Sequence, residues 1–495
     1  MQMPLPDQAV LARRDELVRG LRAIVPGEGV IADDDGMRPY ECDALSAYRQ
    51  LPMVVVLPET TQQVSDILQL CQRLGVKVVP RGGGTSLSGG SLPLADGVLL
   101  ALGKFNRVLE IDYDNRCARV QPGVTNLAIS KAVEHAGFYY APDPSSQIAC
   151  SIGGNVAENS GGVHCLKYGL TTNNLLGIEM VLMSGEIVRL GGKHLDSDGY
   201  DLLGVLTGSE GLLGVVTEVT VRLLRKPPVV RAMLLGFETE EAAGECVAAI
   251  IANGIIPAGL EMMDKDAVHA AEAFCHAGYP LDVGALLIAE LDGPQAEVDH
   301  LIAALEKLAR ERGATVVRVS TSEAERLNFW AGRKAAFPAV GRLSPDYFCM
   351  DGTIPRARLP EVLARIRALS KQHGLRVVNV FHAGDGNLHP LILFDANQPD
   401  ELHRAEELGA DILRLCVEVG GVLTGEHGVG VEKRDLMGTM FNEIDLNQQM
   451  RLKCAFDPDH LLNPGKVFPT LHRCAELGRL HVSGGKLPFP DLPRF

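Results

Sequence analysis

Three features are missing from the 495-residue sequence, and each absence excludes a class of protein. None of the 11 cysteines forms a Cys-x-x-Cys pair, so the chain encodes neither a zinc ribbon nor the ligands of an iron–sulfur cluster. No Gly-x-Gly-x-x-Gly occurs, which argues against a standard Rossmann nicotinamide site. The longest apolar runs, such as residues 53–57, are as short as a β-strand, whereas a membrane span needs roughly 18 residues.

Basic residues are also scarce, since 47 lysines and arginines stand against 62 aspartates and glutamates, for a net charge of −15. Because a nucleic-acid surface needs a basic face, we expect no nucleic-acid partner. The number of cysteines is odd and no secretory signal is recognisable. These two features favour reduced thiols and a cytoplasmic protein.

Glycine is in excess, with 53 copies where average usage of about 7% gives roughly 35. The first of two glycine clusters follows a predicted strand at 76–79. Its loop consists of Arg81, Gly82, Gly83, Gly84, Thr85 and Ser86. Successive glycines can turn several backbone N–H groups towards one anion, which suits a pyrophosphate. A plain glycine-rich turn is the alternative interpretation.

The apolar pattern predicts an α+β protein of two main parts, divided at Pro227 and Pro228. In the second part, strands alternate with helices, which predicts a sheet covered by helices on one face. We divide the chain into an N-terminal helical segment at 1–49, a cofactor-binding domain at 50–228, a substrate or cap domain at 229–450, a segment at 451–470 that returns to the cofactor, and a tail at 471–495.

A predicted hairpin at 376–394 carries two histidines, His382 and His389, around the turn sequence 384–387. A four-residue turn there places the two imidazoles directly opposite each other, on one face of the hairpin. So placed, they could chelate one metal ion. The alternative is a pair of exposed turn histidines.

A third metal ligand is available in the glycine-rich loop 420–430, which contains Glu426 and His427. Two histidines and a glutamate leave an open coordination position for a substrate oxygen. Adjacent loop residues point in different directions, so we assign Glu426 to the metal and His427 to general base catalysis. Arg333 offers a planar fork for a substrate carboxylate, or is an ordinary arginine on a helix surface.

Further motifs connect the first glycine cluster to a known family. They contain Pro144, Ser145, Gly153, Gly154, Asn155, Asn159, Gly161, Gly162, Glu210, Gly211, Gly214 and Val216. In order and spacing, residues 50–228 resemble the two-part FAD-binding domain of the vanillyl-alcohol oxidase flavoprotein family. The resemblance implies an extended FAD with its pyrophosphate on the first glycine loop. Many members link a histidine near that loop to the flavin, but Thr85 and Ser86 stand here, which implies non-covalent FAD.

The second half resembles the C-terminal domain of FAD-linked 2-hydroxy-acid dehydrogenases, most of all the glycolate oxidase branch. The shared segments are 332–338, 350–355, both histidines of the hairpin, Glu426-His427, and the end that contains Asn463. The resemblance implies an α+β cap domain with an antiparallel sheet, His382, His389 and Glu426 as metal ligands, His427 as base, Arg333 as carboxylate anchor and Asn463 near the FAD. Relatives that handle a dicarboxylate carry lysine where Cys349 stands, so a small monocarboxylate is expected.

The expected reaction is oxidation of glycolate or D-lactate to the 2-oxo acid, with hydride transfer to FAD and a zinc or manganese ion orienting the substrate. The resemblance further implies a second FAD-binding subunit and an iron–sulfur subunit, which would bring the protein to the inner face of the membrane. Three alternatives stay open: a D-2-hydroxy-acid dehydrogenase that acts alone, a non-catalytic flavin subunit, and a metallohydrolase that uses the same ligand set.

Overall fold

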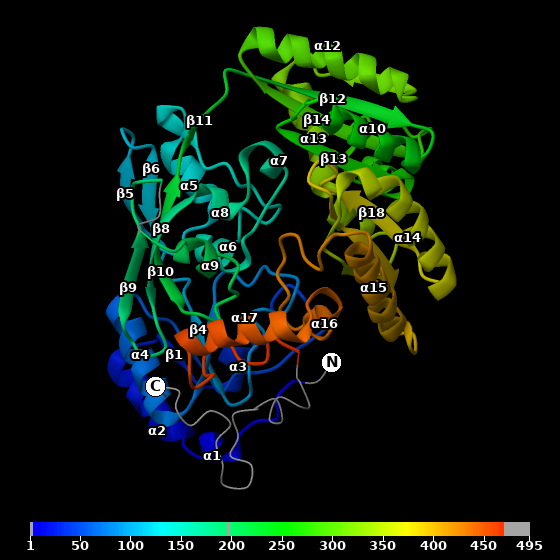
Figure 1. Ribbon diagram of the computed structural model, residues 1–495. Helices are drawn as coiled ribbons and strands as arrows, with labels where there is room; N and C mark the ends of the chain where they lie inside the picture. Colours follow the sequence, from blue (N-terminus) through cyan, green and yellow to red (C-terminus); the bar gives the residue numbers. More distant parts are fainter. Residues whose placement is uncertain (1–2, 196–198, 470–495) are drawn as a thin grey trace.

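The computed structural model describes residues 3–195 and 199–469, which form two lobes (Figure 1). The first lobe contains the N-terminal half, and the second contains the green and yellow segments from β12 to α15. The proposed tail at 471–495 lies outside the described residues. Among the helices of the described ranges, none combines the length and the apolar character that crossing a membrane requires.

The first lobe begins with a small sheet whose strands lie in the order β1-β2-β4-β3. Its strands are β1 (Val30–Ile31), β2 (Val54–Val56), β3 (Lys77–Arg81) and β4 (Gly97–Ala101). Two helices, α2 (Arg14–Ile24) and α4 (Thr61–Leu74), contribute to the core beside it. Helix α4 begins where the Thr60 hydroxyl accepts a hydrogen bond from the Gln63 amide, and it buries Val64, Ile67 and Leu68. This core supports the end of β3, where the first glycine loop starts.

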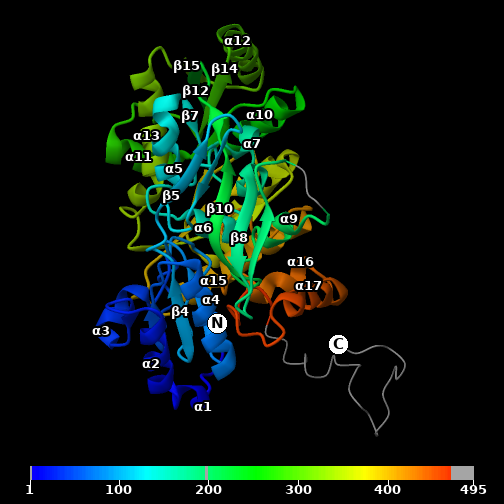
Figure 2. The ribbon, with the colours of Figure 1, turned by 90° about the vertical axis from the view of Figure 1, so that its left-hand side faces the viewer.

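A five-stranded antiparallel sheet completes the first lobe, in the order β5-β6-β10-β8-β9. Figure 2 shows β8 beside β10 in this sheet. Its strands are β5 (Val108–Asp112), β6 (Cys117–Val120), β8 (Leu175–Val181), β9 (Ile187–Gly191) and β10 (Val215–Arg222). The helices of this part include α5 (Asn126–Val133), α6 (Ile152–Glu158), α7 (Cys165–Tyr168), α8 (Thr171–Asn174) and α9 (Leu202–Leu206). Burial alternates along β10, so the strand has one core face, which packs with α6.

The second lobe is built on a seven-stranded antiparallel sheet in the order β15-β12-β14-β13-β18-β20-β16. Its strands are β12 (Val229–Phe237), β13 (Gly259–Asp264), β14 (Ala285–Gly293), β15 (Val316–Val319), β16 (Asp346–Cys349), β18 (Val377–Phe381) and β20 (Pro390–Phe394). Its helices are α10 (Glu240–Ala252), α11 (Lys265–Cys275), α12 (Gln295–Glu311), α13 (Glu323–Val340), α14 (Leu359–His373) and α15 (Glu401–Glu418). The predicted antiparallel sheet is confirmed.

The expectation that helices cover only one face of this sheet is wrong. Met233 and Leu235 of β12 pack with α10, α12, α14 and α15, whereas the intervening Leu234 packs with α11 and α13. Successive side chains of a strand point to opposite faces, so both faces are covered. The sequence signal for this arrangement is the unbroken apolar run at the start of β14, which is buried along nearly its whole length. A strand that exposes one face would instead alternate apolar with polar residues.

The chain returns to the first lobe through α17 (Glu443–Phe456), drawn in orange in Figure 1. The Lys453 ammonium donates hydrogen bonds to the Leu212 and Leu462 carbonyls, at 2.6 and 2.8 Å. The Val78 amide of β3 donates to Leu461, and the Asn463 amide donates to Val78. The last described segment therefore lies along the outer edge of β3. Our division of the chain stays a prediction.

A partly buried polar cluster joins the two lobes at His164. Its Nδ1 lies 2.7 Å from Asp143 of the first lobe, and its Nε2 lies 3.0 Å from Glu290 on β14. Burial lowers the pKa of the imidazole, but the two carboxylates outweigh this effect and hold it well above its usual value. A neutral imidazole has one N–H and can donate to only one of the two carboxylates. The cluster therefore holds the lobes together best when His164 is protonated.

We expect the substitution His164→Gln to destabilise the protein by about 1–3 kcal/mol below pH 6.5, the loss typical of hydrogen bonds to charged groups. A pKa raised by folding stabilises the protein fully below the unfolded value, and this gain is lost as the pH rises through the folded value. The difference in apparent melting temperature between wild type and variant should therefore be larger at pH 6 than at pH 9. His300→Gln, at an exposed position on α12, is the control. A pH-independent difference would contradict this account.

Candidate active site

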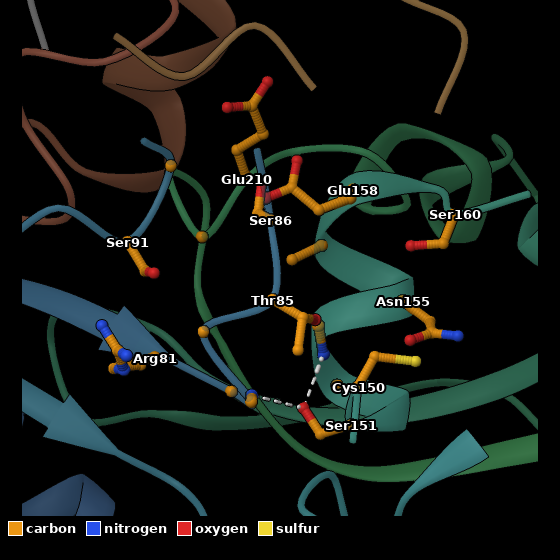
Figure 3. Close-up of a pocket in the computed structure, with 18 of the residues that line it drawn as sticks. Arg81, Thr85, Ser86, Ser91, Cys150, Ser151, Asn155, Glu158, Ser160 and Glu210 are labelled. Atoms are coloured by element: carbon orange, nitrogen blue, oxygen red, sulfur yellow. Dashed lines mark hydrogen bonds between the residues drawn. The ribbon is translucent and has the colours of Figure 1, made fainter. Parts of the chain in front are cut away.

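The largest part of the predicted cofactor site lines one cavity of about 330 Å³ in the first lobe (Figure 3). Its lining includes Arg81, Gly82, Gly83, Gly84, Thr85, Ser86, Pro144, Ser145, Gly153, Gly154, Asn155, Glu210, Gly211, Gly214 and Val216. The cavity also reaches Phe337, His389, Glu426 and His427 of the second lobe. One continuous space thus connects the glycine loops with the predicted catalytic residues.

The two glycine clusters are tied together by Ser151, which sequence reasoning did not select. Its hydroxyl accepts hydrogen bonds from the amides of Gly83 and Gly154, at 3.1 and 3.3 Å (Figure 3). A Cβ atom on Gly83 would lie 2.7 Å from the Ala149 carbonyl oxygen, so only glycine fits this close approach. The glycines therefore allow the loops to approach each other, and they leave the cavity lined by backbone.

Buried polar atoms in this cavity lack a partner among the described residues. They include both side-chain polar atoms of Asn155 and one carboxylate oxygen of Glu158. Buried polar groups are normally hydrogen-bonded, so unpaired donors and acceptors in a cavity wall indicate a polar ligand. A flavin dinucleotide, which carries both donors and acceptors along its length, fits this lining.

Four residues predicted to bind the cofactor lie elsewhere. Asn463 is fully buried, and its amide donates to the Gly90 and Glu210 carbonyls, so it fixes the loops behind the cavity instead of lining it. Gly161 and Gly162 line a separate cavity between the lobes. The fourth outlier is Asn159, which ends α6 and accepts a hydrogen bond from the Thr172 amide. We therefore place all four outside the lining of the flavin cavity.

The predicted metal ligands form a compact group. The Oε1 atom of Glu426 lies 3.3 Å from Nε2 of His382 and 3.4 Å from Nε2 of His389. Both histidines are nearly inaccessible to solvent, so the alternative of exposed turn histidines is wrong. Neither ring nitrogen of His389 has a hydrogen-bond partner among the described residues. Buried imidazole nitrogens that converge on a carboxylate suit a divalent cation.

The predicted register of the hairpin is wrong by two positions. His382 pairs with Asn387 and not with His389, because the turn comprises residues 383–386. Gly386 takes a φ of +78°, and a side chain there would collide with the Ile354 carbonyl. A shift of two residues preserves the face on which each side chain lies. The two imidazoles therefore still meet, with ring centroids 5.0 Å apart.

Glu261 on β13 supports the ligand set from behind. Its carboxylate lies 2.8 Å from His382 Nδ1 and binds the Arg333 guanidinium, at 2.7 Å. A carboxylate on the distal nitrogen of a ligating histidine fixes the orientation of the ring and makes it a stronger ligand. Arg333 is 2% exposed, so it is not a surface arginine, and its guanidinium faces Glu261. Its predicted role as a carboxylate anchor stays a prediction.

Asp351, His389 and His427 form a second convergent group. The Asp351 carboxylate, however, already accepts hydrogen bonds from the Thr424 hydroxyl and the His427 amide, at 2.6 and 2.9 Å, and from the buried Lys433 ammonium at 3.2 Å. Burial raises its pKa, yet Lys433 and the nearby histidines outweigh this and hold it well below its usual value. Since the chain itself neutralises Asp351, we assign it to shaping the loop and not to binding a metal.

His427 stacks on His389, with ring centroids 4.9 Å apart and planes 4° from parallel. Burial lowers the pKa of His427 to about 4, although Asp351 acts in the opposite direction. Its imidazole is therefore neutral near pH 7 and able to accept a proton. It lines the flavin cavity beside Glu426, where the base predicted from the sequence has to lie.

Glu210 fixes the loop that contains His427 to the first lobe. Its carboxylate accepts hydrogen bonds from the amides of Val429 and Gly430, both at 2.7 Å. The Ser86 hydroxyl also donates to the His427 carbonyl, at 3.2 Å. The first glycine loop and the loop of His427 are thus held against each other, which positions the imidazole at the flavin cavity.

Two family descriptions match the chain. Residues 52–191 match a FAD binding domain, and residues 226–467 match the C-terminal domain of FAD linked oxidases. The glycolate oxidase subunit GlcD of Escherichia coli K12 is 60% identical over 482 residues, which cover 97% of each chain. A D-lactate dehydrogenase of Archaeoglobus fulgidus is 34% identical over 443 residues, 88% of this chain and 96% of the relative.

Solved structures also resemble the protein. The structure of p-cresol methylhydroxylase with substrate bound gives a TM-score of 0.78 at 19% identity and covers 94% of this chain and 98% of its own. At this identity the likeness concerns the fold alone. It confirms the predicted fold of the vanillyl-alcohol oxidase type.

Proposed function

The chain belongs to the FAD-linked oxidases, and from this premise we propose that it oxidises a small 2-hydroxy monocarboxylate, such as glycolate, to the 2-oxo acid. FAD binding and oxidoreductase activity follow from the family. The proposal for the substrate rests on one observation. His389 and Glu426, two of the proposed metal ligands, line the flavin cavity together with the imidazole of His427, the proposed base.

His382, His389 and Glu426 would hold a divalent ion, zinc or manganese, which would orient the substrate and lower the pKa of its hydroxyl. His427 takes the hydroxyl proton at Nε2, which lies 3.9 Å from Glu426 Oε1. When bound, FAD supplies at its N5 atom the acceptor for the hydride that leaves the substrate Cα. Arg333 and Glu261 keep His382 oriented, and the stack of His389 on His427 fixes the base.

The buried thiol of Cys349 supports a monocarboxylate, because it offers no cation for a second carboxylate. Non-covalent FAD is also part of the proposal, since Thr85 and Ser86 line the cavity where a histidine attaches the flavin in other members. The complete set of proposed metal ligands speaks against a non-catalytic flavin subunit. Membership of the FAD-linked oxidases speaks against a metallohydrolase.

The relative from E. coli is named as a subunit of glycolate oxidase. By analogy, we propose that this chain passes electrons to a second FAD-binding subunit and an iron–sulfur subunit at the inner face of the membrane. The D-lactate dehydrogenase of A. fulgidus supports a second candidate, a D-2-hydroxy-acid dehydrogenase that acts alone. Affinity purification from the native host separates the two, since only the first brings down stoichiometric partners.

We expect glycolate to bleach the flavin absorbance of the purified protein under anaerobic conditions, because the site combines a base with a hydride acceptor. D-Lactate, L-lactate and D-2-hydroxyglutarate should be tested in parallel. The dicarboxylate should react at least about tenfold more slowly than the preferred monocarboxylate, since a missing charge partner in a buried site costs more than 1.4 kcal/mol. A flavin that stays oxidised with all small 2-hydroxy acids would refute the proposal.

A further inference from the structure

A second cavity, of about 490 Å³, lies between the lobes on the other side of the ligand cluster. The first lobe contributes Gly161, Cys165 and Leu170 to its wall, and the second contributes Arg356, Asp385 and Asn387. No step described above uses this space.

Glu426 lines both cavities, whereas the histidines divide between them. His389 and His427 face the flavin cavity, and His382 faces the second cavity. The ligand cluster therefore lies where the two cavities adjoin. A Cβ atom on Gly161 would lie 2.7 Å from Glu426 Oε2, so the absence of a side chain there keeps the second cavity open up to the carboxylate.

The outer end of this cavity is marked by Asn173 and Pro355, two exposed residues from opposite lobes. Arg356 lies next to them and is the only lysine or arginine among the described residues that line the cavity. Its guanidinium donates to the Gly384 carbonyl at 3.2 Å and forms no ion pair within residues 3–195 and 199–469. Two residues further on, Arg358 lies outside the cavity and pairs with Glu361 at 2.7 Å.

An arginine has five N–H donors in a planar fork that fits a carboxylate. Asp385 lines the same cavity and interacts electrostatically with Arg356, but it does not lie within ion-pair distance. A half-buried arginine in a cavity wall with no carboxylate within 4 Å among the described residues is suited to an anionic ligand, and here the anion would face the ligand cluster. Once FAD occupies the first cavity, the second remains as a path from solvent to that cluster.

We propose that this cavity is the passage by which the small carboxylate substrate reaches the metal-binding side chains, and that Arg356 attracts and guides its carboxylate. The proposal rests on the proposed function and adds a route and a positioning residue to it. A charge that guides a ligand towards a site acts on the association rate and is weakened by salt. The chemical step, at His427, is separate from it.

Stopped-flow flavin reduction under anaerobic conditions tests Arg356. For Arg356→Gln we expect the second-order rate constant of reduction to fall about tenfold, with the limiting rate at saturating glycolate within twofold of wild type, and a weaker dependence on salt. Arg358→Gln, which removes the same charge two residues away, should leave both constants unchanged. Equal effects of the two substitutions, or a lower limiting rate alone, would overturn the role of Arg356.

A steric block tests the route itself. Oxalate serves as a non-reacting dicarboxylate probe whose binding is followed by the change in flavin absorbance of the holoenzyme. Pro355→Trp, at the mouth, should slow its association and dissociation by the same factor, at least fivefold, and leave Kd unchanged. Asn397→Trp, on an exposed loop after β20, is the control. Unchanged rates in Pro355→Trp would refute the route.

The two proposals fail in distinguishable ways. If wild type is bleached by glycolate and neither variant differs from its control, the passage is wrong and the proposed function stands. If no 2-hydroxy acid bleaches wild type, the proposed function is wrong, and the oxalate rates in Pro355→Trp still decide whether the cavity admits small carboxylates.

Discussion

We expect flavin reduction by the substrate to fall by about 10²–10⁴-fold when His427 is replaced by alanine, the range that general base catalysis contributes. The neutral imidazole of His427 lies at the end of the flavin cavity, and its pKa of about 4 keeps it unprotonated near neutrality. Without it, the hydroxyl proton has no acceptor at this place, because Asp351 is committed to Lys433 and to the backbone of the loop. Anaerobic stopped-flow absorbance measures the limiting rate.

The flavin content of His427→Ala should match that of wild type, since the loops that line the cavity are held by Ser151 and Glu210. Dithionite should still reduce the bound flavin, which separates loss of the base from loss of the cofactor. His403→Ala, at an exposed position on α15, is the control for histidine removal. Fast reduction of the variant by glycolate would take His427 out of the role of base.

Local sequence was sufficient to predict the first glycine loop. The strand predicted at 76–79 is close to β3, at 77–81, and the structure places all six residues of the loop from Arg81 to Ser86 in the cavity wall. The face shared by His382 and His389 was also predictable. Side chains alternate between the two faces of a strand, so an error of two positions in register leaves each one on the same face. The register of the two histidines was not predictable, since it depends on the Ile354 carbonyl, which belongs to another part of the chain.

The supporting carboxylates carry no local signal. Glu261 and Asp351 lie on strands or loops far in sequence from the residues that they hold, and an isolated acidic residue in an apolar strand has many possible partners. Asn463 and Arg333 show a different limit, because their motifs were recognised but the contacts of their side chains were not. Each stands in a motif that implies contact with a ligand, but the structure pairs Asn463 with Glu210 and Arg333 with Glu261. Motif membership placed them close to the site but could not give the direction of their side chains.

A single divalent ion per chain should be found in wild type by elemental analysis, and it should be lost in His382→Ala. The ligand set contains one carboxylate and two imidazoles, so removal of one imidazole leaves two ligands, too few for a stable site. Because substrate orientation depends on the ion, the rate of flavin reduction should fall by at least 100-fold, and FAD content should not change. His269→Ala, on α11 and away from the cluster, is the control.

Glu261→Gln weakens the support behind His382 and keeps all three proposed ligands in place. Glutamine has nearly the shape of glutamate but cannot carry the charge that makes His382 a stronger ligand, so metal affinity should fall by about 10–100-fold. Activity should then recover with added zinc or manganese in Glu261→Gln but not in His382→Ala, where a ligand is missing. Wild type that is fully active after chelation, with less than about 0.1 ion per chain, would show that the three side chains act without a metal. In that case His382 would bear on the reaction only through its contacts with Glu426 and Glu261.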